Sequence, residues 1–122
     1  MLQDVLLKIQ IWLKESNLVS DAQLDTLVNL LRGYKKDRII YPGTIKRHLG
    51  IDMKKAYEIL NILLDHNLLE INFEIYCNQS GCEKFQNTIY KTINEIPNDL
   101  TCEYCGSEIN KTKDAIVIFR VK

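Results

Sequence analysis

Four cysteines in the second half of the chain constrain its fold more than any other feature. They form two pairs, with 19 residues between the pairs, and they are Cys77, Cys82, Cys102 and Cys105. Each pair is close enough in sequence for one turn to present both sulfurs, and Gly81 and Gly106 give the backbone freedom to turn there. If the two pairs meet, they offer four soft ligands to one metal ion in a tetrahedron.

The start of the chain bears on the chemical state of these cysteines. Asp4, Lys8 and Gln10 interrupt its first apolar residues, so we expect no signal peptide. No apolar run approaches the ~18 residues that a membrane span needs, so we expect no membrane contact. These features favour a cytoplasmic protein, in which thiols stay reduced. Four reduced cysteines at this spacing predict one structural zinc ion.

Three other interpretations of the cysteines stay open at this point. They are two disulfides, unrelated buried thiols, and a redox pair at Cys102 and Cys105. The redox pair is the most specific of the three interpretations, but the sequence around it has no thioredoxin-like βαβ pattern.

The cysteine arrangement resembles a zinc ribbon. A site of this kind is structural, because four cysteines close the coordination sphere and leave no position for a catalytic water. Between the pairs, several apolar residues are expected to cover the metal site, namely Ile89, Tyr90, Ile93, Ile96 and Pro97.

The first 69 residues are rich in leucine, and their apolar residues recur at helical spacing. A first helix is predicted over about residues 2–14, with one apolar face formed by Leu2, Val5, Leu6, Ile9, Trp12 and Leu13. Leu7 and Ile11 fall outside this face. A helix that is apolar on more than one side lies deep in a core or contacts a second chain, so a homodimer through this helix is one expectation.

A second helix is predicted after Ser20. Ser20 and Gln23 have the spacing of a capping box, and Leu24, Leu27, Val28 and Leu31 would form its buried stripe. Gly33 is expected to end this helix in the left-handed conformation. The β-prone residues 38–41 and the turn signal Pro42-Gly43 follow.

Residues 44–70 have the pattern of two helices joined by a tight turn. Thr44 is expected to cap a short helix through Leu49, Gly50 to permit the turn, and Asp52 to cap the next helix, about residues 53–65. This next helix would bury Ala56, Ile59, Leu60 and Leu63.

The segment resembles a winged helix-turn-helix domain. The residues that carry the resemblance are Ile45, Leu49, Gly50, Ile51, Ala56, Leu60, Leu63 and the exit at 67–70. One departure is Lys46, which stands where the family usually has a small residue. The resemblance implies that helix 53–65 enters a DNA major groove. The residues then expected to meet DNA are Lys46, Arg47, His48, Lys54, Lys55 and Asn61.

The charge distribution allows two interpretations of this segment. The whole chain has 16 basic and 16 acidic residues, whereas residues 32–55 contain eight basic and two acidic ones, a net of +6. Such a stretch suits phosphate contacts, and a solvated surface of mixed charge is the alternative. Glu58 and Asp65 offset the lysines of the second helix, and an exposed Ile62 would suit protein docking.

Together these patterns predict an α+β fold. Residues 1–76 would form a helical winged helix-turn-helix domain, and residues 77–122 a β-rich, zinc-ribbon-like module. Strand 115–121 is expected to return antiparallel to strand 69–77, which alternates apolar and polar residues. The module would then be an enlarged wing. The alternative is a separate ribbon, a layout that resembles a general transcription factor.

The function predicted from the sequence is DNA binding by a small transcriptional regulator. The sequence offers no nucleophile–base pair, no phosphate-cradling glycine loop and no open metal site, so we expect no enzyme. The alternative function is a protein-binding adaptor, a subunit of a larger assembly. Its expected contacts are Leu7, Ile11, Trp12 and Ile62.

Overall fold

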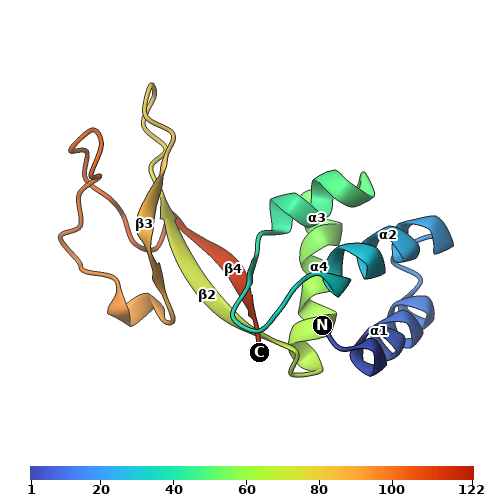
Figure 1. Ribbon diagram of the computed structural model, residues 1–122. Coiled ribbons are helices and arrows are strands. Elements are labelled where there is room, and N and C mark those ends of the chain that lie inside the picture. The colour runs from blue at the N-terminus through green and yellow to red at the C-terminus, as the bar shows by residue number, and fades with distance from the viewer. The chain divides into compact units, whose positions relative to one another are not determined.

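The computed structural model describes residues 1–122 and has a mixed α/β fold (Figure 1). Four α-helices precede three longer strands, and a short strand lies between the second and third helices. Two compact units result. One comprises Met1–Glu70 and Phe119–Lys122 and is called the helical unit, and the other comprises Ile71–Ile118 and is called the cysteine unit.

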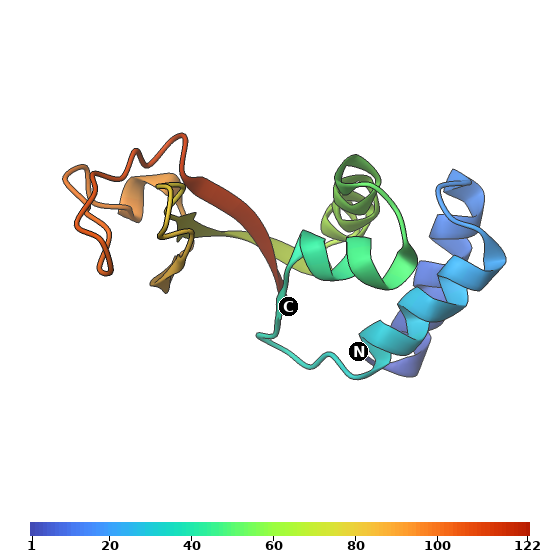
Figure 2. The ribbon, with the colours of Figure 1, turned by 90° about the horizontal axis from the view of Figure 1, so that it is seen from above.

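The helical unit packs four helices around one another. They are α1 (Gln3–Ser16), α2 (Asp21–Arg32), α3 (Pro42–Leu49) and α4 (Met53–Asp65). α1 packs on α2 and α4, and α3 packs on α2 and α4. Figure 2 shows α1 and α2 lying side by side. Their buried leucine and isoleucine side chains recur at helical spacing, as predicted, and include Leu6, Ile9, Leu13, Leu24, Leu27 and Leu31.

Two of the predicted helix caps are present with both partners in place. Ser20 Oγ accepts from the Gln23 N–H at 3.1 Å, and Gln23 Oε1 accepts from the Ser20 N–H at 2.9 Å. Asp52 Oδ1 accepts from the Lys55 N–H at 2.8 Å at the start of α4. Each cap satisfies N–H groups that a helix start otherwise leaves without partners.

Two other predictions about helix ends differ from the structure. α2 ends at Arg32 with Gly33 as its C-cap, as predicted, but the conformation of Gly33 is not the expected one. Gly33 does not take the left-handed conformation, because its φ is −83° and its N–H bonds back to the Leu30 carbonyl as in a right-handed turn. Thr44 does not cap α3, which begins two residues earlier at Pro42 with Tyr41 as N-cap. Proline suits the first helical position, since its missing N–H would have no helical partner there.

The strands form one curled antiparallel sheet in the order β1-β4-β2-β3. Their bounds are β1 (Ile39–Ile40), β2 (Leu69–Tyr76), β3 (Phe85–Tyr90) and β4 (Ala115–Val121), with a 3-10 turn, η1 (Ile93–Glu95), after β3. β1 pairs with the end of β4, where Ile39 lies opposite Arg120. β2 pairs with β3, where Phe73 lies opposite Tyr90, and the register shifts between Glu74 and Tyr76.

The burial of β2 differs from the predicted alternation. Ile71 is 39% exposed, whereas Asn72 and Glu74 are buried. β2 is an interior strand of the sheet, with a neighbour on each side. The register shift between Glu74 and Tyr76 coincides with a second break in the alternation, because Ile75 is buried directly after Glu74. No buried side-chain nitrogen or oxygen atom of the chain lacks a hydrogen-bond partner.

Candidate metal centre

The first cysteine pair lies at the tip of the β2–β3 hairpin. Cys77 follows β2, and its N–H donates to the Lys84 carbonyl at 2.9 Å, which continues the pairing beyond the strands. Within the turn, the Cys82 N–H donates to the Gln79 carbonyl at 3.0 Å. Gly81 has a φ of 86°, a conformation that glycine adopts without strain.

The second pair occupies a shorter loop, which backbone hydrogen bonds also hold in a turn. The Cys102 N–H donates to the Ser107 carbonyl at 2.8 Å, and the Gly106 N–H donates to the Cys102 carbonyl at 2.9 Å. Below this turn, Thr101 and Glu108 form an isolated antiparallel bridge. The loop therefore holds both Cys102 and Cys105 on one turn, with Gly106 at a φ of 75°.

The four sulfur atoms lie together in a site that could hold a metal ion. All four are within 4.8 Å of one another. The shortest separations join the two pairs: Cys77 Sγ is 3.7 Å from Cys105 Sγ, and Cys82 Sγ is 3.6 Å from Cys102 Sγ. These distances are far from the roughly 2.05 Å of a disulfide, and all four cysteines are free thiols. Thiolates at about 2.3 Å from a tetrahedral ion would be about 3.8 Å apart, close to both separations.

Hydrogen bonds favour the thiolate form at the second pair. Burial acts to raise the pKa of Cys102, but backbone N–H groups at Cys105 and Tyr104, together with Gln86, outweigh it and lower the pKa to about 6. The pKa of Cys105 is lowered mainly by hydrogen bonds with the Ser107 side chain and backbone. A hydrogen bond to the charged form is the expected cause of such a shift.

The first pair is shifted in the opposite direction. Burial, followed by the thiols of Cys102 and Cys105, raises the pKa of Cys82 to about 12. At Cys77 a backbone hydrogen bond from Gln79 acts to lower the pKa, but burial and the neighbouring thiols raise it overall. Four thiolates cannot approach so closely without a compensating positive charge, and a bound cation would supply one.

Gln86 is a residue of this site that the sequence analysis missed. Its side chain is buried, its Nε2 donates to Cys102 Sγ at 3.3 Å, and its Oε1 accepts from the Glu103 N–H at 2.9 Å. Gln86 therefore ties β3 to the second cysteine pair and orients one ligand, as outer-shell groups of metal sites do. A polar residue within a strand carries no sequence signal for this role.

An apolar cluster packs behind the two cysteine pairs. Its buried members are Ile75, Cys77, Ile96, Cys102 and Ile109, and Tyr90 and Ile93 pack against it. Three of the residues predicted to cover the metal site are thus in place. The expectation for Pro97 is wrong, since it is exposed directly after the buried Ile96.

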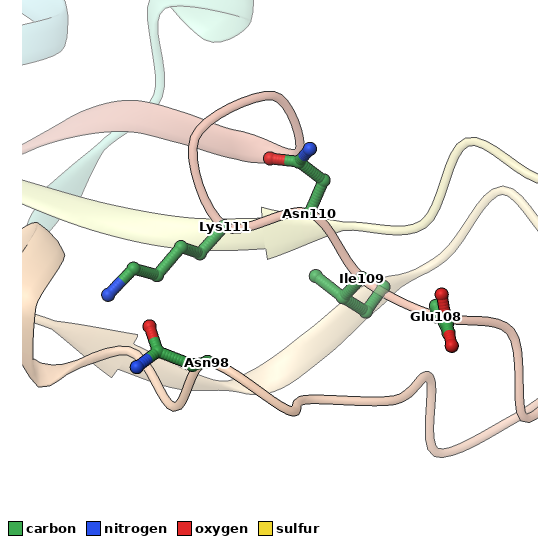
Figure 3. Close-up of a pocket in the computed structure, with 5 residues that line it drawn as sticks. All are labelled: Asn98, Glu108, Ile109, Asn110 and Lys111. Atoms are coloured by element: carbon green, nitrogen blue, oxygen red, sulfur yellow. The ribbon is translucent and has the colours of Figure 1, made fainter.

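The same unit contains an open pocket of about 410 Å³, which includes none of the cysteines in its lining (Figure 3). Figure 3 shows Lys111 and Asn98 at one end, Glu108 at the other and Ile109 between them. Lys111 Nζ also donates to the Ile96 carbonyl at 3.4 Å. Lys111 therefore helps to hold the loop before β4 against the apolar cluster.

The residues predicted to meet DNA all belong to the helical unit. Lys46, Arg47 and His48 are exposed in the last turn of α3, where the His48 ring nitrogen Nδ1 lies 2.9 Å from the Thr44 carbonyl. On α4, Lys54 and Asn61 are exposed and Lys55 is half-buried. The basic residues of this set therefore lie at the end of α3 and the start of α4.

The residues predicted to meet a protein partner differ in exposure. Leu7 and Ile11 are 51% and 56% exposed on α1. Trp12 is half-buried and contacts the ring of His66 within the helical unit. Ile62 is also half-buried on α4. Only Leu7 and Ile11 of this set thus present large exposed apolar surface.

No helix is both long and apolar enough to cross a membrane. No protein-family model, curated protein or solved structure matches the chain.

Proposed function

We propose that this chain is a non-enzymatic DNA-binding protein, a small transcriptional regulator, whose cysteine cluster holds one structural zinc ion. The observation that carries the proposal is the accessible basic surface formed by the end of α3 and the start of α4. Arg47 and Lys54 are exposed there, and Lys55 is half-buried beside them.

The choice of zinc rests on the ligand set. Four cysteine sulfurs in a tetrahedral arrangement suit zinc, which has no geometric preference of its own and binds thiolates strongly. The sulfur separations of 3.6 and 3.7 Å support such a site. Four protein ligands fill the coordination sphere, so the role is structural.

The arrangement of helices and strands supports a winged helix-turn-helix. Gly50, with a φ of 66°, makes the turn between α3 and α4, and antiparallel strands follow α4. In this interpretation α4 is the recognition helix. Lys54 and Lys55 at its start would contact phosphates, and Asn61, two turns further on, could read an adenine edge in the major groove.

The net charges of the two units differ in sign, which supports DNA binding by the helical unit alone. The helical unit contains 12 basic and 9 acidic residues, a net of +3, whereas the cysteine unit contains 4 basic and 7 acidic residues, a net of −3. The zero net charge of the whole chain therefore conceals a cationic unit. A polyanion such as DNA is attracted to the helical unit.

Binding of zinc-loaded protein to random duplex DNA, at about 50 and about 200 mM salt, tests the proposal. Contacts to several phosphates predict an affinity that falls steeply with salt. Arg47→Gln and Lys54→Gln should each lower the slope of log affinity against log salt by about 1. The same change at the exposed Lys8 and Lys14 of α1 is the control. Absence of binding at both salt concentrations would contradict the proposal.

The second candidate is the adaptor function, and Leu7 and Ile11 favour it. They lie one helical turn apart, so half-exposed apolar side chains share one face of α1. Burial of this face against a second copy or another protein would stabilise a complex. Light scattering of the full chain, with Leu7→Lys compared with Asp25→Lys on α2, tests self-association. In a pull-down, Leu7→Lys should lose partners that Asp25→Lys keeps.

A further inference from the structure

The two edge strands of the sheet differ greatly in length. In the order β1-β4-β2-β3, β1 and β3 each have a neighbour on one side only. β1 has two residues and β3 has six. An edge strand offers backbone N–H and C=O groups to any extended chain, and proteins commonly shorten such strands to prevent pairing. β1 is protected in this way and β3 is not.

β3 also lacks charged residues and proline, although its pairing with β2 contains a register shift and Glu103 bonds to the side chains of Gln86 and Asn87. The sequence of β3, Phe-Gln-Asn-Thr-Ile-Tyr, contains no charged residue and no proline. Asn87 and Thr88 in its middle are exposed to solvent. Charged side chains, especially lysine, and prolines are the usual means of blocking strand addition. A six-residue edge without either is suited to pair with another strand.

The surroundings of β3 favour a cationic partner. The cysteine unit has a net charge of −3, and a zinc ion held by four thiolates would make it more negative if the proposed metal is correct. Lys84 and Lys91 flank β3 directly, so the excess of negative charge belongs to the unit as a whole. Its acidic residues near β3 are Glu83, two residues before the strand, and Glu103, whose carboxylate accepts from Asn87 Nδ2 at 3.5 Å. Both glutamates are exposed. This charge disfavours nucleic acid at β3, and it disfavours a second copy of the same unit.

Two exposed aromatic rings near the start of β3 suit the same partner. Tyr104 is 50% exposed, and Lys84 Nζ lies 4.8 Å from the centroid of its ring. The Lys84 ammonium group thus already lies at this ring within cation–π distance. Phe85 is 41% exposed, and its ring packs on Tyr76 at a centroid distance of 4.9 Å. A guanidinium group interacts with such rings at least as well as an ammonium group.

We propose that β3 is a docking edge for a partner protein, and that an extended segment bearing lysine or arginine adds to it as a fifth strand. Backbone hydrogen bonds along β3 would provide the pairing, as in other cases of strand addition. Glu83, Glu103 and Tyr104 would select basic side chains. This function is separate from DNA binding by the helical unit.

The test uses the zinc-loaded full chain and three synthetic peptides of about ten residues. The first alternates valine with arginine, the second alternates valine with glutamate, and the third repeats the first with alternate backbone nitrogens methylated. Methylation keeps every side chain and charge but removes N–H donors from one edge. Binding is measured by fluorescence anisotropy, and amide hydrogen exchange locates the bound peptide.

The proposal predicts that only the first peptide binds well, with slower exchange at the amides of β3. The glutamate and methylated peptides should each bind at least about tenfold more weakly. Thr88→Lys places a positive charge on the edge and should also weaken binding about tenfold. The matched control is Thr26→Lys, which adds the same charge at an exposed threonine of α2 and should leave peptide affinity unchanged.

Several results would overturn the proposal. If the arginine peptide and its methylated form bind equally tightly, the peptide is held by charge attraction and does not add to the sheet as a strand. Binding of the glutamate peptide as tightly as the arginine peptide would contradict selection of a cationic partner. Binding of none of the peptides would contradict it as well. A dimer of the peptide-free protein that Thr88→Lys breaks would assign the edge to a second copy. Binding of single-stranded DNA that Thr88→Lys strengthens and Thr26→Lys does not would assign it to nucleic acid.

Thr88→Lys also separates this proposal from the DNA-binding proposal. Because Thr88 belongs to the cysteine unit, the variant should bind duplex DNA as the unchanged protein does. Loss of peptide binding with unchanged DNA binding supports both proposals, and each can fail without the other.

Discussion

The indole ring of Trp12 lies flat against the imidazole ring of His66, with centroids 3.6 Å apart and planes inclined by 2°. Trp12 comes from α1 and His66 is the residue after α4, so the contact joins the first and last helices of the helical unit. Stacked aromatic pairs stabilise a fold by more than their buried area accounts for. Here the pair holds the first helix of the unit against the end of the last.

Replacement of Trp12 by alanine is therefore expected to destabilise the helical unit. Loss of a half-buried indole and its stacking should lower the free energy of unfolding by about 2 kcal/mol. His66→Ala removes only the stacking and should cost about 1 kcal/mol. Urea denaturation followed by circular dichroism measures both. Equal effects of the two variants would contradict a packing role for the indole.

Replacement of Cys102 by serine is expected to unfold the cysteine unit and spare much of the helical unit. Cys102 is buried in the apolar cluster and accepts hydrogen bonds from Gln86 and Tyr104. Structural zinc supplies folding free energy, on the order of 10 kcal/mol in small modules, which this variant would lose. Far-ultraviolet circular dichroism should retain helical signal while bound zinc falls below one per chain. Loss of all structure, or of none, would argue against two units.

Zinc affinity is expected to increase with pH. The pKa of Cys82 is raised to about 12 and that of Cys77 is also raised, so both are protonated at neutral pH without metal. A zinc ion must displace these protons, and acid competes with binding. Competition with a coloured chelator between pH 6 and 8 should give the weakest binding at pH 6. Proton release on zinc addition in a weak buffer provides an independent check, and no release would contradict the expected protonation state.

Two glycines, one within α3 and one between α3 and α4, are expected to respond oppositely to alanine. Gly50 has a φ of 66°, where a side chain costs about 1 kcal/mol, so Gly50→Ala should destabilise. Gly43 lies within α3, and a Cβ there would be 3.7 Å from Arg47 Nη1, an ordinary contact. Gly43→Ala should therefore stabilise by about 0.5–1 kcal/mol. Thermal denaturation of the pair measures the difference, and shifts in the same direction would contradict the turn geometry.

Local chemistry explains which parts of this fold the sequence predicts well. The capping box at Ser20, the Asp52 cap and the turn at Gly50 all depend on residues near one another in sequence, and each prediction is confirmed. The buried face of α4, with Ala56, Ile59, Leu60 and Leu63, follows from helical periodicity for the same reason. The clustering of the four cysteines is also confirmed, because ligand spacing reflects the geometry of a single turn.

The features that the sequence did not predict depend on distant parts of the chain. Asn72 and Glu74 are buried on β2, which lies inside the sheet between β4 and β3. Gln86 bonds to Cys102, 16 positions further along the sequence, and no local pattern predicts such a contact. At the predicted end of α2, the right-handed conformation of Gly33 shows that glycine permits the left-handed conformation without requiring it.

The close sulfur contacts between the cysteine pairs have a consequence for the order in which the site assembles. Cys82 and Cys102 are 20 residues apart, and Cys77 and Cys105, 28 apart, enclose them as an outer loop. The loops are nested, so closing the inner one brings the outer two sulfurs within a few residues of each other. Most of the conformational entropy that the chain loses on forming the site is therefore lost when the inner loop closes. An ion captured first by Cys82 and Cys102 would gain its last two ligands almost without further entropic cost.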